Sequence, residues 1–497
     1  MKKYYFILIL LSLIALWPFF KQGFFESHDG EWMVIRFSAF HQTLAAGQFP
    51  VRFVDRLNNN YGYPVLNFLY PLPFYLAEIP KIAGFGFVDS IKIVFAVSTV
   101  FSVVGMYWAL SHRFSKYAAL AGSLIYLFIP YRFVDLYVRG SLGENVAFAM
   151  APVILGGIFK LTKDRNEFLA ILSVSIALLV MSHNVLAIIF IPLFFLLSVI
   201  LIKKDIFKIT AAFLVGLFVS SFFWLPAFYD LHFVKLSQIN VSNVSDHLSS
   251  AKRLIFPSWG LGQPPQQENG LSTQFGLISL AVFIASTFSF LISKRDKIIG
   301  TLIVVYIAIF FLITNYSAAF WRIPHVDIIQ FPWRLLSLIV LISALLAAYV
   351  VDSVKNKKLV ASLIIAIGII STIIYTKPSN FVDRSEGFYS TNEDTTTVRY
   401  EYLPLWVEEK PEIRANRKIE IEGNGEIISS EIKAANYKAE INAQEEVKII
   451  VNTIYFPGWK ASIDDENVNI NYRDNPNGLM SFKLPEGSHK VIIKYGK

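Results

Sequence analysis

The stretch Glu26-Ser27-His28-Asp29-Gly30-Glu31 lies directly after the first hydrophobic segment, Tyr4 to Phe20, and opens an amphipathic run. An acidic cluster just outside a first membrane helix, followed by a helix in the interface, is positioned to present a carboxylate to a lipid-borne substrate. We therefore take Asp29 as the candidate catalytic residue. Asp is also a favourable helix N-cap, and the two roles are compatible.

The run after this stretch predicts a helix that lies on the membrane surface. Apolar side chains recur at steps of four, three and four, at Met33, Phe37, Phe40 and Leu44. Gly47 and Pro50 end the run. The next apolar segment, Val65 to Ile79, is interrupted by prolines and predicts a re-entrant or interfacial hairpin. Residues 21–87 are thus expected to form a long first outer loop.

Composition indicates a polytopic α-helical membrane protein. Of 497 residues, 54% are hydrophobic and 16% are charged, and the mean hydropathy is +0.50. Because about 20 apolar residues cross the hydrocarbon core, we expect about eleven spans. They are roughly 4 to 20, 88 to 111, 117 to 131, 143 to 160, 166 to 181, 184 to 202, 209 to 228, 273 to 293, 298 to 315, 333 to 352 and 359 to 376.

Charge distribution predicts the topology. Lys and Arg cluster in alternate connections between spans, which places those connections and the N-terminus in the cytoplasm and the tail after Lys377 outside. The net charge of +8 does not indicate nucleic-acid binding, because the basic residues punctuate apolar segments and form no basic stripe. The sequence has no cysteine, which excludes disulfides, thiolate metal sites and cysteine nucleophiles.

The tail has a different composition. Segments 418–422, 447–451 and 490–495 alternate apolar and polar residues as strands do, and turn sequences lie at 474–478 and 484–487. We expect residues 1–376 to form a transmembrane domain and residues 377–497 an extracytoplasmic β-sandwich-like domain.

Ionisable side chains gather at the outer ends of the expected spans. They are Arg132, Asp135, Arg139 and Glu144 around one loop, His183 beside Asn184, and His325, Asp327 and Arg334 near the tenth span. Because charges at membrane depth are costly, such residues are seldom present without a function. The expected topology places them on the same side as Asp29, which predicts a shared outward-facing cleft.

This combination suits group transfer from a phosphate-linked donor. A carboxylate deprotonates the incoming hydroxyl, and arginine stabilises the phosphate that leaves. Because the site is expected to be buried in the membrane, the donor is expected to be a lipid phosphate. Asp29 is the expected catalytic residue. Donor-phosphate or substrate binding is assigned to Arg139, Arg334, His183, His325, Glu144 and His28.

Each assignment has a structural alternative. Arg139 and Glu144 can form an ion pair that holds the bundle, His183 can belong to a tight polar turn, and Arg334 can be a snorkelling anchor. The acidic stretch could gather a divalent metal ion through Glu26, His28, Asp29 and Glu31, but it lacks a D-x-D spacing. The need for a metal is left open, and no other cofactor is expected.

A set of short motifs resembles a bacterial membrane family. They are Ser27-His28-Asp29, Gly47-Gln48-Phe49-Pro50, Gly62-Tyr63-Pro64, Tyr70-Pro71-Leu72-Pro73, Arg139-Gly140-Ser141-Leu142-Gly143-Glu144, Ser182-His183-Asn184, Gln330-Phe331-Pro332-Trp333-Arg334 and Glu401-Tyr402-Leu403-Pro404. This family is known as the 6-pyruvoyl-tetrahydropterin-synthase-related membrane proteins and is similar in layout to GT-C glycosyltransferases. The tail, with Tyr455-Phe456-Pro457-Gly458-Trp459-Lys460, resembles the extracytoplasmic β-domain of YfhO-type proteins.

The resemblance covers nearly the whole chain and implies a GT-C architecture with a catalytic acid in the first outer loop. Asp29 matches the acidic residue that follows the first span in those enzymes. The implied donor is a sugar on a polyprenyl phosphate. Several GT-C enzymes have paired acids where this sequence has His28-Asp29, which leaves metal dependence open.

The sequence therefore predicts an inverting glycosyltransferase of the bacterial plasma membrane. It would transfer a sugar from a polyprenyl-phosphate donor to a cell-envelope polymer or glycolipid on the outer face. Two alternatives stay open. A transporter or flippase of a lipid-linked sugar needs the arginines but no base, and a non-catalytic envelope scaffold needs neither.

Overall fold

A computed structural model describes residues 2–163, 165–239, 243–256, 258–260, 262, 270–292 and 295–496. The chain forms two compact units, each made of separate stretches of sequence. The first unit is Met1–Met33, Tyr70–Ser221 and Ser242–Asp383, and the second is Val34–Leu69, Phe222–Val241 and Arg384–Lys497. Expected boundaries at residues 1, 293 and 497 lie outside the described residues.

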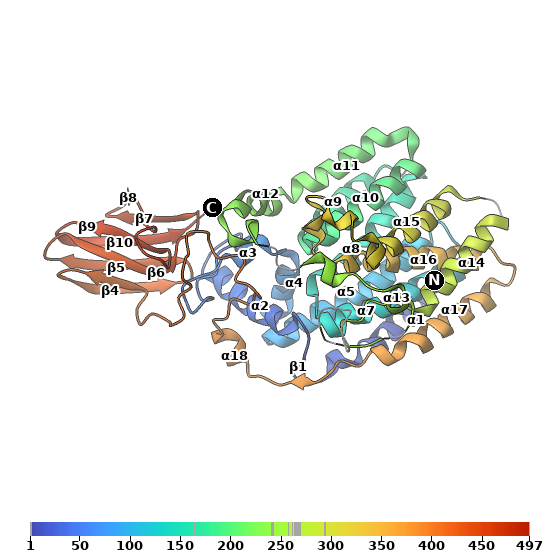
Figure 1. Ribbon diagram of the computed structural model, residues 1–497, viewed down its shortest axis with the longest axis horizontal. Helices are drawn as coiled ribbons and strands as arrows, with labels where there is room; N and C mark the ends of the chain where they lie inside the picture. The colour runs from blue at the N-terminus through green and yellow to red at the C-terminus, as the bar shows by residue number, and fades with distance from the viewer. Residues whose placement is uncertain are drawn as a thin grey trace. The chain divides into compact units, whose positions relative to one another are not determined.

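Helices dominate the first unit (Figure 1). They are α1 Lys2–Ala15, α4 Leu72–Ile82, α5 Phe87–Leu110, α6 Lys116–Leu127, α7 Pro130–Phe133, α8 Leu142–Leu161, α9 Phe168–Ser182, α10 Asn184–Leu201, α11 Ile206–Val219, α13 Ala251–Ile255, α14 Gly276–Ile292, α15 Lys297–Ile313, α16 Leu336–Asp352 and α17 Lys357–Thr372. A π-helix, η2 Val134–Arg139, continues α7, and the 3₁₀ turn η10 Pro332–Leu335 precedes α16. Strands β1 Phe24–Phe25 and β2 Phe381–Val382 pair antiparallel.

Within the described chain, helical residues occupy every one of the eleven expected spans. Five helices are long and apolar enough to cross a membrane, and two bent pairs would raise that number to seven. One pair bends by 48° before Pro130 and the other by 65° at Ser220. Helices α9, α14 and α15 are apolar but shorter. Eleven complete spans therefore stays a prediction, because several segments bend or end before they reach full length.

Small side chains bring the helices of the first unit close together. A Cβ atom on Gly122 of α6 would lie 2.5 Å from the carbonyl oxygen of Ala344, so α6 and α16 meet where no larger residue fits. Ser279 of α14 exchanges hydroxyl hydrogen bonds with Ser343 of α16 at 2.7 Å and with Tyr306 of α15 at 2.9 Å. These contacts satisfy polar groups inside an apolar bundle.

The second unit contains two antiparallel sheets that share one hydrophobic core. One sheet has the order β4-β5-β10-β7-β8 and the other β3-β6-β9 (Figure 1). The strands are β3 Ile419–Glu422, β4 Gly425–Lys433, β5 Asn436–Ala443, β6 Val447–Ile454, β7 Trp459–Ile463, β8 Glu466–Val468, β9 Leu479–Leu484 and β10 Gly487–Tyr495. The three strands expected from alternation form as β3, β6 and β10, and the two expected turns lie between strands.

The units do not divide at residue 376. Stretches 34–69 and 222–241 join the tail, and the boundary before the tail falls at Asp383. The reason is apolar packing, because Phe53, Phe68 and Val234 belong to the same buried cluster as the strands. Composition marks the polar tail but carries no signal for core residues that come from distant loops.

The helix expected after the acidic stretch is present as α2 Gly30–Ala45. Its polar side is partly covered, because Arg36 is only 7% exposed and its Nε donates to Thr396 Oγ1 at 2.8 Å, and its place on the membrane surface stays a prediction. The expected hairpin over residues 65–79 forms two short helices, α3 Val65–Phe68 and α4. The helix α12 Ser221–Asp230 and the short helix α18 Glu386–Thr391 complete the list of α-helices.

Candidate functional site

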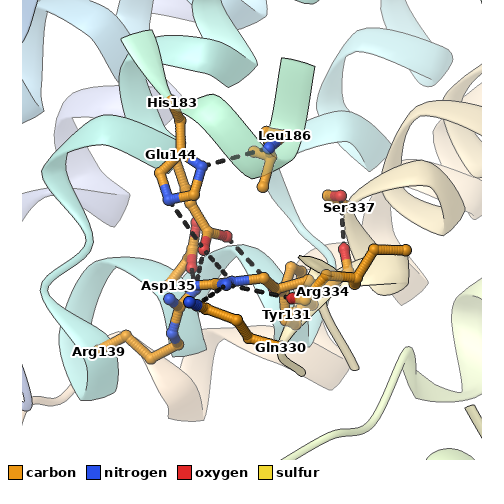
Figure 2. A network of polar contacts seen from close by, with 10 residues as sticks. Tyr131, Asp135, Arg139, Glu144, His183, Leu186, Gln330, Arg334 and Ser337 are labelled. Atoms are coloured by element: carbon orange, nitrogen blue, oxygen red, sulfur yellow. Dashed lines mark hydrogen bonds and ion pairs between the residues drawn. The ribbon is translucent and has the colours of Figure 1, made fainter. Parts of the chain in front are cut away.

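A buried network of charged side chains lies in the first unit (Figure 2). Arg139 Nη1 is 2.5 Å from Asp135 Oδ1 and 2.6 Å from Glu144 Oε1. Arg334 Nε is 3.3 Å from the same Glu144 oxygen. All four side chains are less than a tenth exposed. The charges of two guanidinium groups and two carboxylates thus compensate one another at a place where water cannot solvate them.

Local backbone geometry brings Arg139 and Glu144 together. Pro130 starts α7, and the chain then widens into the π-helix that carries Asp135 and Arg139 on one side. Gly140 ends it with a left-handed φ of 60°. The amide of Ser141 donates to the Asp135 carbonyl at 3.0 Å, and α8 begins one residue later with Glu144 in its first turn. A tight reversal therefore points both side chains into the same space.

Aromatic and polar neighbours hold the network in place. The guanidinium carbon of Arg139 lies 4.6 Å from the centre of the Trp333 ring, a favourable stacking for arginine. The Tyr131 hydroxyl donates to Glu144 Oε2 at 3.4 Å. Arg334 Nη1 donates to Gln330 Oε1 at 2.8 Å. Nε and Nη2 of Arg139 make no hydrogen bond within the described residues, so those donors are uncommitted.

His183 connects two helices and borders the network (Figure 2). It lies between α9 and α10, and its Nδ1 accepts the amide hydrogen of Leu186 at 3.2 Å as an N-cap. An accepting Nδ1 leaves the proton of the neutral ring on Nε2, which is 3.7 Å from Glu144 Oε1. The expected polar turn is therefore present, and the same ring also contacts the charged network.

Backbone hydrogen bonds hold Asp29 beside this network. The amide of Asp29 donates to the Arg139 carbonyl at 2.8 Å, and the amide of His28 donates to the Val138 carbonyl at 3.0 Å. The Asp29 carbonyl accepts from Met33 at 2.9 Å, so Asp29 also starts α2. Its carboxylate is half-buried and close enough for its charge to act on both Arg139 and Arg334.

The carboxylate of Asp29 differs from those of Asp135 and Glu144. It accepts no hydrogen bond within the described residues, whereas the other two are held by Arg139. It is also partly accessible, whereas Glu144 is completely buried. Of these three carboxylates, Asp29 is the most exposed.

The structure brings most of the expected site residues together, but not all of them. Asp29, Arg139, Glu144, His183 and Arg334 meet as described above. His325 is exposed between two 3₁₀ turns and makes no contact with the network within the described residues. His28 is joined to the network region by its backbone. The side chain of Asp327 lies outside the described part of the chain.

The suggested metal ligands of the acidic stretch do not come together. Among the described residues, no group of three or more His, Asp or Glu side chains is arranged to hold a metal ion. Glu26 instead accepts a hydrogen bond from Asn380 Nδ2 at 3.0 Å. The residues present therefore do not fit the divalent site that the stretch suggested.

The sequence placed Asp135 among the charges of the expected cleft without giving it a role, and it did not indicate Tyr131, Gln330 and Trp333 as site residues. Asp135 and Arg139 are four residues apart, a spacing that pairs charges on a helix. Their contact could therefore have been predicted from the sequence. Gln330 is likewise four residues from Arg334, whereas the contact of Tyr131 with Glu144 joins residues thirteen positions apart and follows no helical spacing.

Comparisons with known proteins agree with this fold. Residues 66–380, more than half of the chain, match a membrane protein family described as the 6-pyruvoyl-tetrahydropterin synthase related domain. The chain belongs to this family. That family was expected from the short motifs, and its matched region contains Arg139, Glu144, His183 and Arg334.

Individual proteins are similar to this chain at low sequence identity. The arabinofuranosyltransferase AftD from Mycobacteria superimposes with a TM-score of 0.52 at 14% identity, over 78% of this chain and 28% of AftD. ArnT from Cupriavidus metallidurans, solved with undecaprenyl phosphate, gives 0.46 at 14% identity, over 71% and 61% of the two chains. An uncharacterized protein of Lactococcus lactis subsp. cremoris is 26% identical over 259 residues, 48% of this chain and 41% of that protein.

The chain spans less than half of the Lactococcus relative and just over a quarter of AftD. At this identity the match to AftD shows that the two proteins share a fold. This family member is therefore a membrane protein whose fold is similar to that of GT-C glycosyltransferases.

Proposed function

We propose that this protein is a glycosyltransferase of the bacterial plasma membrane. It transfers a sugar from a polyprenyl-phosphate donor to a cell-envelope polymer or glycolipid on the outer face. One observation carries the proposal: an accessible carboxylate, Asp29, lies beside two buried arginines whose charges are already compensated. A glycosyltransferase fold supports the same reaction class.

The proposed reaction is a single displacement. An acceptor hydroxyl oxygen attacks the anomeric carbon of the donor, and its proton passes to the Asp29 carboxylate. The bond between that carbon and the phosphate oxygen breaks, and the electron pair leaves with the phosphate. Because one oxygen enters as the other leaves from the opposite side, the anomeric configuration inverts.

Arg139 and Arg334 are proposed to bind the donor phosphate. Their guanidinium groups stay charged and match phosphate oxygens. Glu144 is a positioning residue, because its one oxygen contacts both arginines and fixes the distance between them. The uncommitted Nε and Nη2 of Arg139 can then donate to the phosphate without loss of the Glu144 contact. His183 orients Glu144 from the other side.

The donor class follows from chemistry and location. Sites that hold two arginines at the ends of apolar helices suit an anionic head group on a lipid tail. The basic connections between spans indicate that the N-terminus and those connections are cytoplasmic. The same rule gives an extracytoplasmic second unit, so acceptor and donor would meet at the outer face.

Transfer of label tests the proposal. Purified full-length protein in nanodiscs is mixed with radiolabelled polyprenyl-phosphate sugars and extracted envelope glycopolymers. Asp29→Asn is expected to lower transfer by about 100-fold or more, the usual size of a general-base contribution, with donor binding unchanged. Glu167→Gln, at a carboxylate whose ion pair with Arg165 is more than half exposed on both sides, is the control and should behave as wild type.

Two outcomes would contradict the proposal. Full activity of a normally produced Asp29→Asn variant would remove Asp29 as the base. A donor that crosses the bilayer without being consumed would establish a transporter, which needs the arginines but no base. For the phosphate ligands, Arg334→Ala should raise the KM for the donor more than the KM for the acceptor, and the reverse result would exclude Arg334 from donor binding.

A further inference from the structure

A polar hollow lies within the second unit, formed by residues of two distant stretches. Its volume is about 380 Å³, within the range of small-molecule sites. The lining residues are Asn58, Asn59, Asn392, Glu393, Asp394, Thr395, Tyr400, Lys410 and Glu412. Amide, carboxylate and hydroxyl groups thus dominate a concave surface that the charged network and Asp29 do not use.

Asn58 is the unusual member of this lining. Its side chain is 1% exposed, and neither its Oδ1 nor its Nδ2 has a hydrogen-bond partner within the described residues. A primary amide offers two donors and one acceptor, and burying these without partners costs free energy. Since Asn58 lines the hollow, a ligand there would complete these hydrogen bonds once the side chain turns toward it.

The wall that carries Asn58 is built rigidly. Asn58, Asn59 and Asn60 have consecutive left-handed φ angles of 61°, 54° and 65°, a conformation that asparagine tolerates better than most residues. The Asn59 side chain donates to the carbonyls of Pro411 at 3.1 Å and Glu412 at 3.0 Å. Its backbone amide donates to the Glu393 carbonyl at 3.1 Å. The two sides of the hollow are therefore tied together before any ligand binds.

Charge in the hollow selects against anions. Glu393, Asp394 and Glu412 contribute three carboxylates and Lys410 contributes one ammonium group. Lys410 is paired with Glu412 at 3.3 Å and Arg414 with Glu393 at 3.2 Å, which leaves Asp394 as the lining carboxylate without an ion pair among the described residues. A phosphate or carboxylate ligand would be repelled. A metal ion is also disfavoured, since no three suitable ligands converge among the described residues.

A neutral ligand with many hydroxyl groups fits these observations. Carboxylate oxygens accept from hydroxyls, and an amide both donates to one hydroxyl and accepts from its neighbour. Asp394 Oδ1 already accepts from the Thr396 amide at 2.8 Å, while Oδ2 makes no hydrogen bond within the described chain. Tyr400 adds an aromatic ring that is 42% exposed.

We propose that this hollow is a binding site for a neutral saccharide, with Asn58 and Asp394 as hydrogen-bonding residues. The site recognises hydroxyl groups and disfavours uronic acids, phosphates and sulfates. The inference goes beyond the proposed transfer reaction and concerns binding alone, so it stands or falls separately from the role of Asp29.

Calorimetric titration of the full-length protein in nanodiscs tests this site. The probes are maltotriose, chitotriose and mannotriose as neutral ligands and trigalacturonate as an anionic one. At least one neutral trisaccharide should bind saturably, and trigalacturonate should bind more weakly. Asn58→Gly removes the amide but keeps the left-handed backbone at no strain, and it should weaken binding by about tenfold or more.

A matched variant separates binding from folding. Asn60→Gly has the same backbone conformation in the same loop but does not line the hollow, so its affinity should equal that of wild type. Asn58→Asp, which exchanges the donors for a charge, should also weaken binding. Thermal unfolding of each variant checks that the fold is intact.

Three results would overturn the proposal. The first is the absence of binding by all three neutral probes. The second is equal affinity for Asn58→Gly and Asn60→Gly. The third is trigalacturonate binding as tightly as the best neutral trisaccharide. Loss of transfer in the label assay with saccharide binding retained would instead count against the proposed enzyme alone.

Discussion

Glu144 is the residue on which the charged network depends. One of its carboxylate oxygens contacts Arg139 at 2.6 Å, Arg334 at 3.3 Å and His183 at 3.7 Å. The residue is fully buried, so water cannot replace it. Removing one partner of a buried ion pair leaves an uncompensated charge, which is more costly than never having built the pair.

Glu144→Gln is therefore expected to destabilise the protein strongly. The variant keeps the volume but removes the charge that compensates two guanidinium groups, and the free energy of unfolding should fall by about 3–5 kcal/mol. Unfolding by SDS in mixed micelles measures the loss. Glu167→Gln breaks an ion pair with Arg165 in which both side chains are more than half exposed, and it should unfold as wild type. Equal unfolding of the two variants would contradict the structural role of Glu144.

At the scale of elements, the reversal from η2 to α8 positions the site. Gly140 has a φ of 60°, and a Cβ atom there would lie 2.6 Å from Ser27 Oγ and 2.8 Å from the Gly30 amide nitrogen. The acidic stretch thus lies against the backbone of this turn. Only glycine permits both the left-handed conformation and the close approach.

Gly140→Ala should separate the acidic stretch from the arginines. The left-handed conformation alone costs about 1–3 kcal/mol for alanine, and the contact with a backbone nitrogen cannot be relieved by a side-chain rotation. We expect lower stability together with a loss of transfer activity. SDS unfolding measures the first and the label assay measures the second.

A second glycine supplies the control for this prediction. Gly157→Ala lies in the interior of α8, where the added Cβ is 4.0 Å from the nearest atom, on Leu172. It should be neutral or stabilise by up to about 1 kcal/mol, because alanine is the better helix former. Normal activity of Gly140→Ala would show that the position of Asp29 does not depend on this turn.

At the scale of the whole molecule, the β-sheet unit depends on residues far away in sequence. Phe53 is fully buried, with its ring centre 5.3 Å from those of Trp459 and Tyr495. Lys418 Nζ donates to the carbonyl of Asn60, and Asp55 Oδ2 is 3.8 Å away. Burial lowers the pKa of Lys418, and the charge of Asp55 opposes this. The strands therefore lack both an apolar and an ionic partner without the 34–69 stretch.

A fragment of residues 384–497 should accordingly be less stable than the same fragment joined to residues 34–69 by a flexible linker. Loss of a buried phenylalanine costs about 3–5 kcal/mol, so the difference in unfolding free energy should be at least of this size. Urea unfolding followed by circular dichroism measures it. The joined protein with Phe53→Ala should lose most of the gain, and equal stability of the two fragments would show that the tail folds independently.

Part of this architecture was predictable because it depends on local patterns in the sequence. Hydropathy located the helical segments, and alternation located strands β3, β6 and β10. The motifs identified the family that the comparison found. The residue types of the site could also be predicted, since charged residues at the ends of apolar segments are rare and easily identified in the sequence. The position of His325 away from the network within the described residues could not be predicted, because proximity in sequence or along one face does not give direction in space.

The sequence by itself determined that this is a helical membrane protein with a β-rich tail, because burial in lipid or on one face of a sheet imposes a period on neighbouring residues. Only the tertiary structure decided that Glu144 contacts both Arg139 and Arg334, that residues 34–69 complete the core of the tail, and that Asn58 lines a polar hollow. Each of these joins residues far apart in the chain. Such contacts depend on how elements pack, and packing leaves no periodic trace in a single sequence.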